Sequence, residues 1–129
     1  DLRDLFSSPN ALVRKRAALA AGRIGDEDAI GTLTNLLEKD ADPGVRAMAA
    51  FALGEIESEA GATALVAVLK NKSESVELRA RAIEAFGKIA GALPREKEAR
   101  QRELDLSELE VVTVLEIVTE EYGADRART

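Results

Sequence analysis

This chain repeats a twelve-residue pattern three times, beginning at Val13, Val45 and Leu78. The copies read VRKRAALAAGRI, VRAMAAFALGEI and LRARAIEAFGKI, and their starts are 32 and then 33 residues apart. A period of this length is typical of stacked supersecondary units that bury their apolar faces against their neighbours. The identical columns are Arg14/Arg46/Arg79, Ala17/Ala49/Ala82, Ala20/Ala52/Ala85, Gly22/Gly54/Gly87 and Ile24/Ile56/Ile89.

The second repeat predicts two helices separated by a turn. Its first helix has an apolar stripe at helical spacing, formed by Ile30, Leu33, Leu36 and Leu37. Asp42 follows as a natural N-cap and Pro43 as a natural first-turn residue, so a second helix is expected through Ile56. An antiparallel helix pair is therefore the predicted unit.

The same plan extends over three repeats, at about residues 2–25, 26–57 and 58–90. An N-cap residue type stands four residues before each repeated arginine: Asn10, Asp42 and Ser75. We therefore expect an all-α fold, specifically an α-solenoid of antiparallel helix pairs. Because the chain opens with Asp1 and the first repeat retains only the end of its first helix, we expect a piece of a longer protein.

The chain after the third repeat departs from the pattern. Pro94 can begin a helix, and Ser107 with Glu110 makes a capping-box pattern ahead of an apolar stretch that ends at Gly123. The β-branched residues in this stretch would also suit a strand, but the capping box and the length favour a helix. We expect a divergent helix pair over residues 94–123.

The divergent pair is expected to cap the stack, so that residues 1–123 form a single domain. Residues 124–129 are expected to be a frayed tail. An alternative is that the last helix is a docking surface, either for self-association with another copy of the chain or for the rest of a larger protein.

The repeated glycine and arginine columns both predict structural contacts. Glycine inside a helix costs about 1 kcal/mol relative to alanine, so three copies suggest close approach of a neighbouring helix. The repeated arginine is expected to bridge toward the preceding cap or toward the loop of the next unit. This structural interpretation is favoured over contact with a ligand.

The pattern V-R-x-x-A-A-x-A-x-G-x-I-G, preceded by D-x-D-P-G, resembles the HEAT repeat. The resemblance is closest to the short bacterial type that is grouped with the phycobilisome-lyase HEAT-like repeats, and it covers about residues 2–93. It implies an armadillo-like superhelix of helix pairs. It also implies that the second helices line an inner, concave surface, which is the usual binding face of the family.

We define the inner face by the non-repeated columns of the second helices that a helical wheel places opposite the packing face. Three of its side chains, Leu19, Met48 and Phe51, are apolar and should be exposed side by side. Two interpretations remain open for them: intramolecular packing covers them, or they form an apolar anchor with a polar rim. The inner face comprises Arg16, Leu19, Arg23, Met48, Phe51, Glu55, Arg81, Glu84 and Lys88.

Composition limits the chemistry that this chain can perform. It has no histidine and no cysteine, which removes the commonest general base, zinc-thiolate sites and thiol catalysis. The resemblance raises a di-iron hydroxylase, but the iron sites of those enzymes use histidine, which is missing here. We expect no enzyme activity, no cofactor and no metal. The absence of cysteine fits an intracellular protein, and we expect a cytoplasmic location.

The function predicted from the sequence is a non-catalytic scaffold that presents its inner face to a partner protein. A nucleic-acid-binding module is one alternative, supported by a local surplus of basic residues over residues 65–97. The net charge of −6 opposes phosphate binding, so no nucleic-acid partner is expected. A bilin-lyase-like protein is the other alternative, and only the resemblance suggests it. No segment is apolar enough to predict a membrane partner.

Overall fold

The computed structural model describes residues 2–92, 114–118 and 120 of the chain. The chain divides into two compact units, Asp1–Ala92 and Leu93–Thr129. In the second unit, residues 114–118 and 120 are helical and Val114 is buried, in agreement with the helix predicted there. The rest of the predicted divergent pair and the predicted tail lie outside the described residues. The boundaries of a single domain over residues 1–123 stay a prediction.

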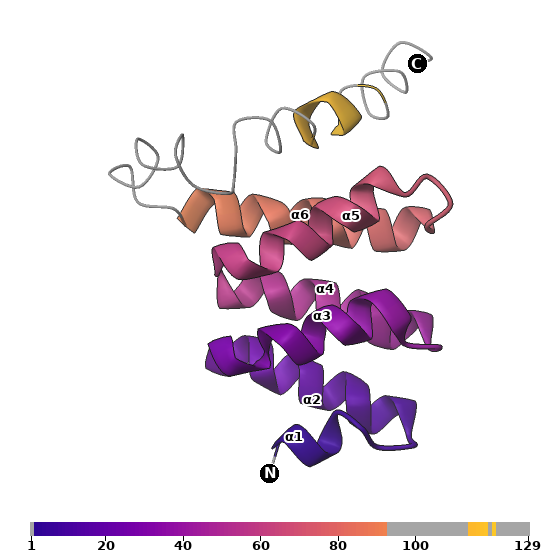
Figure 1. Ribbon diagram of the computed structural model, residues 1–129, viewed down its shortest axis with the longest axis vertical. Coiled ribbons are helices and arrows are strands. Elements are labelled where there is room, and N and C mark those ends of the chain that lie inside the picture. The colour runs from indigo at the N-terminus through magenta and orange to yellow at the C-terminus, as the bar shows by residue number, and fades with distance from the viewer. Residues whose placement is uncertain (1, 93–113, 119, 121–129) are drawn as a thin grey trace. The chain divides into compact units, whose positions relative to one another are not determined.

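The first unit is a succession of helix pairs, which follow one another along the stack in Figure 1. Helix α2 packs against α4 and α4 against α6, while α1, α3 and α5 pack against α2, α4 and α6, respectively. The predicted all-α solenoid is confirmed. The elements are α1 (Leu2–Leu5), α2 (Ala11–Ile24), η1 (Glu27–Ala29), α3 (Ile30–Lys39), α4 (Pro43–Ile56), η2 (Glu59–Gly61), α5 (Ala62–Lys70) and α6 (Val76–Ala92).

The core lies between the two helices of each pair and between successive pairs. The apolar stripe of α3 is buried at Leu33 and Leu37, and that of α5 at Leu65 and Leu69. One column of repeated alanines in α2, α4 and α6 also belongs to this core. Its members, Ala17, Ala49 and Ala82, are almost completely buried. The second layer, formed by α2, α4 and α6, also buries large side chains, among them Val45, Leu53 and Ile89.

Each long helix of the second layer begins at the N-cap that the sequence predicts. The Asn10 side chain accepts a hydrogen bond from the Leu12 amide at 2.9 Å. Asp42 accepts from the Gly44 amide at 2.7 Å and from the Val45 amide at 3.2 Å. Ser75 Oγ accepts from the Leu78 amide at 3.1 Å. These bonds satisfy helix amides that have no partner within the helix, and so fix where each helix begins.

The ends of α2 and α4 share a left-handed backbone conformation but differ in residue type. Gly25 follows α2 with φ 73°, and Glu57 follows α4 with φ 59°. Glycine adopts this region readily, whereas a side chain with a Cβ atom makes it less favourable. Glu57 is the only non-glycine residue with positive φ among the described residues.

Two of the three repeated glycines allow successive helices of the second layer to touch at their backbones. A Cβ atom at Gly22 would lie 2.9 Å from Ala52 Cα, and one at Gly54 would lie 2.7 Å from Ala85 Cα. Both distances are too short for any side chain, which confirms the predicted close approach. At Gly87 the prediction is not met within the described residues, because none of their atoms lies within 4 Å of the place that a Cβ atom would take.

The repeated arginine of α2 joins three successive segments of the stack. Its Nε donates to Asp40 Oδ2 at 2.9 Å and its Nη2 to Asp40 Oδ1 at 3.0 Å, while Nη1 donates to the Ser8 carbonyl at 2.8 Å. Asp40 also accepts from the Asp42 amide at 2.9 Å. The hydrogen bonds from Arg14 lower the pKa of the Asp40 carboxyl below its ordinary value, against the opposing effect of burial. The same pairing raises the pKa of Arg14.

The repeated arginine of α4 makes the equivalent bridge one repeat later. Arg46 forms a two-point pair with Glu74, in which Nη1 donates to Glu74 Oε2 at 3.0 Å. Its Nε donates to the Leu37 carbonyl at 2.7 Å. In α6, Arg79 Nη2 donates to the Leu69 carbonyl at 3.0 Å. The structural role predicted for the arginine column is therefore confirmed.

A helix that crosses a lipid bilayer must be both long and apolar. Within residues 2–92, 114–118 and 120, no helix combines sufficient length with sufficient apolar character to do so.

Candidate protein-binding surface

The nine residues of the inner face all lie on α2, α4 and α6, three on each helix. None of them is buried, although the same three helices bury Ala17, Ala49 and Ala82 on the other side. The charged members other than Glu55 are exposed. The helical wheel therefore separated the packing side from the accessible side of these helices correctly.

The apolar members of the inner face are less accessible than the sequence predicts. Leu19, Met48 and Phe51 are half-buried rather than exposed, because adjacent helices of the layer lie close together. The sequence predicts exposed side chains here, and the structure shows them only partly exposed. The structure lies between the two open interpretations, since packing covers part of each side chain and leaves part accessible.

One cluster within the inner face joins α4 to α6. Lys88 Nζ lies 4.6 Å from the centroid of the Phe51 ring and also forms an ion pair with Glu55. A cation over an aromatic face is attracted by the negative charge density of the ring. The ammonium group of Lys88 therefore covers part of the Phe51 ring, which contributes to the ring being only half-accessible.

A second ion pair lies on α6 alone. Arg81 Nη1 is 3.5 Å from Glu84 Oε2, and the two side chains are 55% and 63% exposed. Water screens a pair of this kind strongly, so it contributes little to stability. Its effect on the inner face is to neutralise two charges of opposite sign locally.

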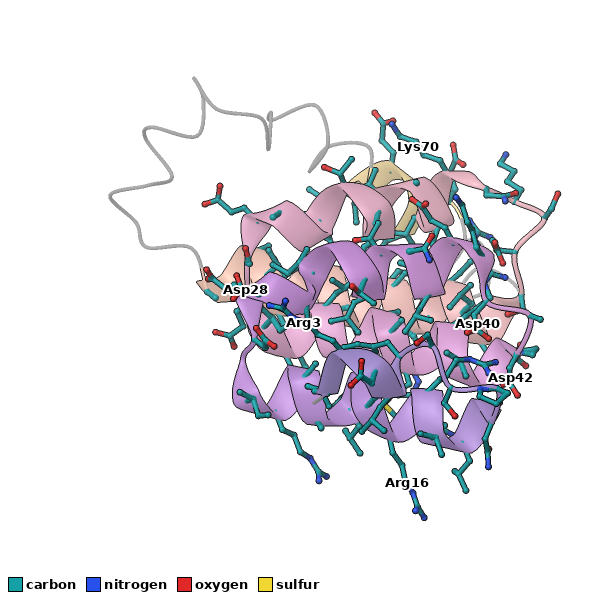
Figure 2. All side chains as sticks on the ribbon, turned by 60° about the horizontal axis from the view of Figure 1, so that its bottom comes forward. Arg3, Arg16, Asp28, Asp40, Asp42 and Lys70 are labelled. Carbon is teal, nitrogen blue, oxygen red and sulfur yellow. The ribbon has the colours of Figure 1, made fainter. Side chains whose placement is uncertain are left out.

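The two arginines of the inner face on α2 have no such partner. Within residues 2–92, 114–118 and 120, neither Arg16 nor Arg23 takes part in an ion pair or a side-chain hydrogen bond. Figure 2 shows the Arg16 side chain extending away from the ribbon. The guanidinium groups of Arg16 and Arg23 are therefore available to a binding partner.

The structure adds Leu12 to this accessible side of α2. The Leu12 side chain is 53% exposed and lies one helical turn before Arg16. Sequence reasoning missed it because it precedes the repeated pattern, and its counterparts in the other repeats, Gly44 and Glu77, are not apolar. The spacing of Leu12, Arg16, Leu19 and Arg23 was the available signal, since these positions share one helix face.

An open depression of about 780 Å³ lies away from the inner face, where η1 and the start of α3 meet α1. Figure 2 shows two of its lining residues, Arg3 and Asp28, near each other. Asp26 at its edge already accepts a hydrogen bond from the Asp28 amide at 3.1 Å. Among the described residues, no group of three or more potential ligands is placed to hold a metal ion.

Comparison with known proteins identifies the repeats. Residues 1–87 match the family model for HEAT repeats. Comparison with curated proteins gives no match. The match covers the first two repeats and the third as far as Gly87, and so includes every residue of the inner face except Lys88.

Proposed function

Because this chain belongs to the HEAT repeat family, we propose that it is a non-catalytic scaffold that binds a partner protein through its inner face. HEAT repeats commonly mediate interactions between proteins. The observation that carries the proposal is the partial exposure of Leu19 on α2 and of Met48 and Phe51 on the adjacent α4, all on one side of these helices. Apolar groups surrounded by charged groups form the usual centre and rim of a protein interface.

The rigidity of the stack supports the same proposal. Backbone contacts at Gly22 and Gly54 fix the spacing between successive helices, and the pairs Arg14–Asp40 and Arg46–Glu74 fix the loops. A binding surface that is already ordered loses less conformational entropy when a partner binds. The inner face is therefore suited to recognition without any change in its backbone.

The composition also favours binding over chemistry. The sequence contains neither histidine nor cysteine, and its net charge of −6 favours a protein partner over a nucleic acid. The scaffold is proposed to act in the cytoplasm, as the lack of cysteine favours. Self-association through the C-terminal helix remains compatible with this function.

The test is affinity capture from a lysate of the source organism with the wild-type chain and a Met48→Glu/Phe51→Glu variant. Two buried charges would prevent an apolar contact with a partner, so we expect proteins that the wild type enriches to be lost with the variant. Circular dichroism and thermal unfolding must show that the variant is folded. If the partners remain bound to the folded variant, the inner face is not the binding site.

A matched control introduces the same charges elsewhere. Ile24 and Val76 are 72% and 77% exposed and do not belong to the inner face. The Ile24→Glu/Val76→Glu variant should therefore capture the same proteins as the wild type. Loss of capture by this control alone would place the binding site outside the inner face.

A further inference from the structure

The charges of the inner face are unevenly distributed among its three helices. Four cations and two carboxylates give the nine residues a net charge of +2, within a chain whose net charge is −6. On α4 and α6, Glu55 pairs with Lys88 and Arg81 pairs with Glu84, so these charges largely cancel. The positive charge that remains is that of Arg16 and Arg23 on α2.

Helix α2 itself contains no carboxylate that could neutralise these arginines. Its sequence, ALVRKRAALAAGRI, has four basic residues and no acidic one. Arg14 is occupied by Asp40, whereas Arg16 and Arg23 have no ion-pair partner in the part of the chain that the structure describes. A carboxylate from another molecule could form an ion pair with Arg16 or Arg23 without breaking any existing contact.

The two arginines alternate with leucines along one side of α2. Leu12, Arg16, Leu19 and Arg23 follow one another over about 16 Å of helix axis, and Leu12 is 53% exposed. Guanidinium groups bind carboxylates with two parallel hydrogen bonds, and the leucines between them offer apolar contact. A ligand that matches this stripe carries acidic groups separated by apolar ones.

We propose that the occupant of the inner face is an acidic, amphipathic peptide segment of the partner protein. This inference rests on the proposed function and specifies the chemistry of the partner. A phosphate backbone would meet the carboxylates of Glu55 and Glu84, and its bases would find on the inner face a single aromatic ring, Phe51, which Lys88 partly covers. Single-stranded nucleic acids bind through several accessible aromatic rings together with a continuous basic groove. Peptide carboxylates separated by apolar side chains fit the observed stripe better.

The test uses the full chain as bait for a display library of random 16-residue peptides. The sequences enriched by the wild type should be net acidic and richer in leucine, isoleucine and phenylalanine than the input library. Binding of a selected peptide, measured by fluorescence anisotropy, should weaken as the salt concentration rises. Enrichment of neutral or basic peptides, or no enrichment at all, would overturn the inference.

Charge reversal tests the assignment to α2. The Arg16→Glu/Arg23→Glu variant should bind the selected acidic peptides at least about tenfold more weakly at low salt, because each like-charge contact is unfavourable. The control is Lys70→Glu/Lys72→Glu, which makes the same change of net charge at exposed positions at the end of α5 and in the loop after it. Equal weakening by both variants would show that only the overall charge matters and would overturn the assignment.

Two further outcomes separate this inference from the proposed function. If a single-stranded oligonucleotide binds the wild type as tightly as the selected peptides and depends equally on Arg16 and Arg23, the ligand class is wrong. If the Met48→Glu/Phe51→Glu variant loses its captured protein but the α2 charge reversal does not, the scaffold function stands and the acidic character of the partner fails.

Discussion

Lys88 of α6 lies over the ring of Phe51 in α4, with its Nζ 4.6 Å from the ring centroid. The same ammonium group is paired with Glu55, one turn further along α4. On the accessible side of the stack, the Lys88 side chain therefore connects two adjacent repeats. The glycine–alanine contacts connect the same helices at their backbones. This contact determines how much of Phe51 a partner can reach.

Replacing Lys88 with alanine should reduce the free energy of unfolding by about 1 kcal/mol. The variant loses the cation–π contact, which contributes about 0.5–1 kcal/mol at an exposed site, and the ion pair, which contributes about 0.2–1 kcal/mol. Urea unfolding measures the change. Lys72→Ala removes an exposed lysine in a loop and should change the stability by less than about 0.5 kcal/mol. Equal effects of the two substitutions would show that the Lys88 contacts do not contribute.

Alanine substitutions at Gly54 and Gly87 should have opposite effects, although the two glycines occupy the same column of the repeat. A Cβ at Gly54 would lie 2.7 Å from Ala85 Cα, so Gly54→Ala should destabilise the chain by about 1–3 kcal/mol. At Gly87 the described residues leave space, so Gly87→Ala should gain up to about 1 kcal/mol from helix propensity. Thermal unfolding of both variants distinguishes packing from propensity, and a similar loss at both positions would contradict this account.

Glu57→Gly should stabilise the chain by about 0.5–1 kcal/mol. Glu57 has φ 59°, a left-handed conformation that costs a residue with a Cβ atom about 1 kcal/mol and that glycine adopts freely. Glu57→Ala is the control, because it removes the same charge and keeps the Cβ atom. A gain in the urea midpoint with alanine as large as that with glycine would attribute the effect to charge.

Asp40→Asn should lower the midpoint of thermal unfolding at neutral pH by several degrees. The substitution removes the carboxylate that accepts two hydrogen bonds from the Arg14 guanidinium. The pKa of Asp40 is lower in the folded chain than its ordinary value of about 4. The carboxylate therefore contributes its full stabilisation at pH values above about 4. This contribution is lost as the pH falls through the lowered pKa. The difference between wild type and variant should therefore be constant above about pH 5 and shrink below it. Glu38→Gln, at an exposed position of α3, should leave the midpoint nearly unchanged.

Sequence reasoning predicted the helix pairs because their signals are local. N-caps at Asn10, Asp42 and Ser75 and the apolar stripe of α3 depend only on residues within one or two turns. The close approach at Gly54 was also predictable, since a glycine inside a helix needs a compensating contact. Features fixed by a few neighbouring residues could be inferred without coordinates.

For contacts between repeats, the sequence predicted the type of contact but not the partner residues. The arginine column indicated bridges, but the choice of Asp40 and Glu74 depends on the path of each loop, and these acids occupy different positions relative to the following N-cap. A helical wheel assigned Phe51 to the accessible side but could not show that Lys88 reaches across from the next helix. The left-handed backbone conformation of Glu57 was likewise missed. The first repeat has a glycine at this position, Gly25, but glutamate carries no local signal of that conformation.

The second repeat supplies one partner on each side to two kinds of contact between repeats, the arginine–acid pair and the glycine–alanine contact. It supplies the acid Asp40 to the arginine before it and the arginine Arg46 to the acid after it. It likewise supplies Ala52 to the preceding glycine and Gly54 to the following alanine. In the chain, Arg14 and Asp40 are 26 positions apart. If residues 26–57 were duplicated in tandem, Arg46 of the first copy and Asp40 of the second copy would have the same separation. Arrays of this type can therefore lengthen by gene duplication without inventing a new junction.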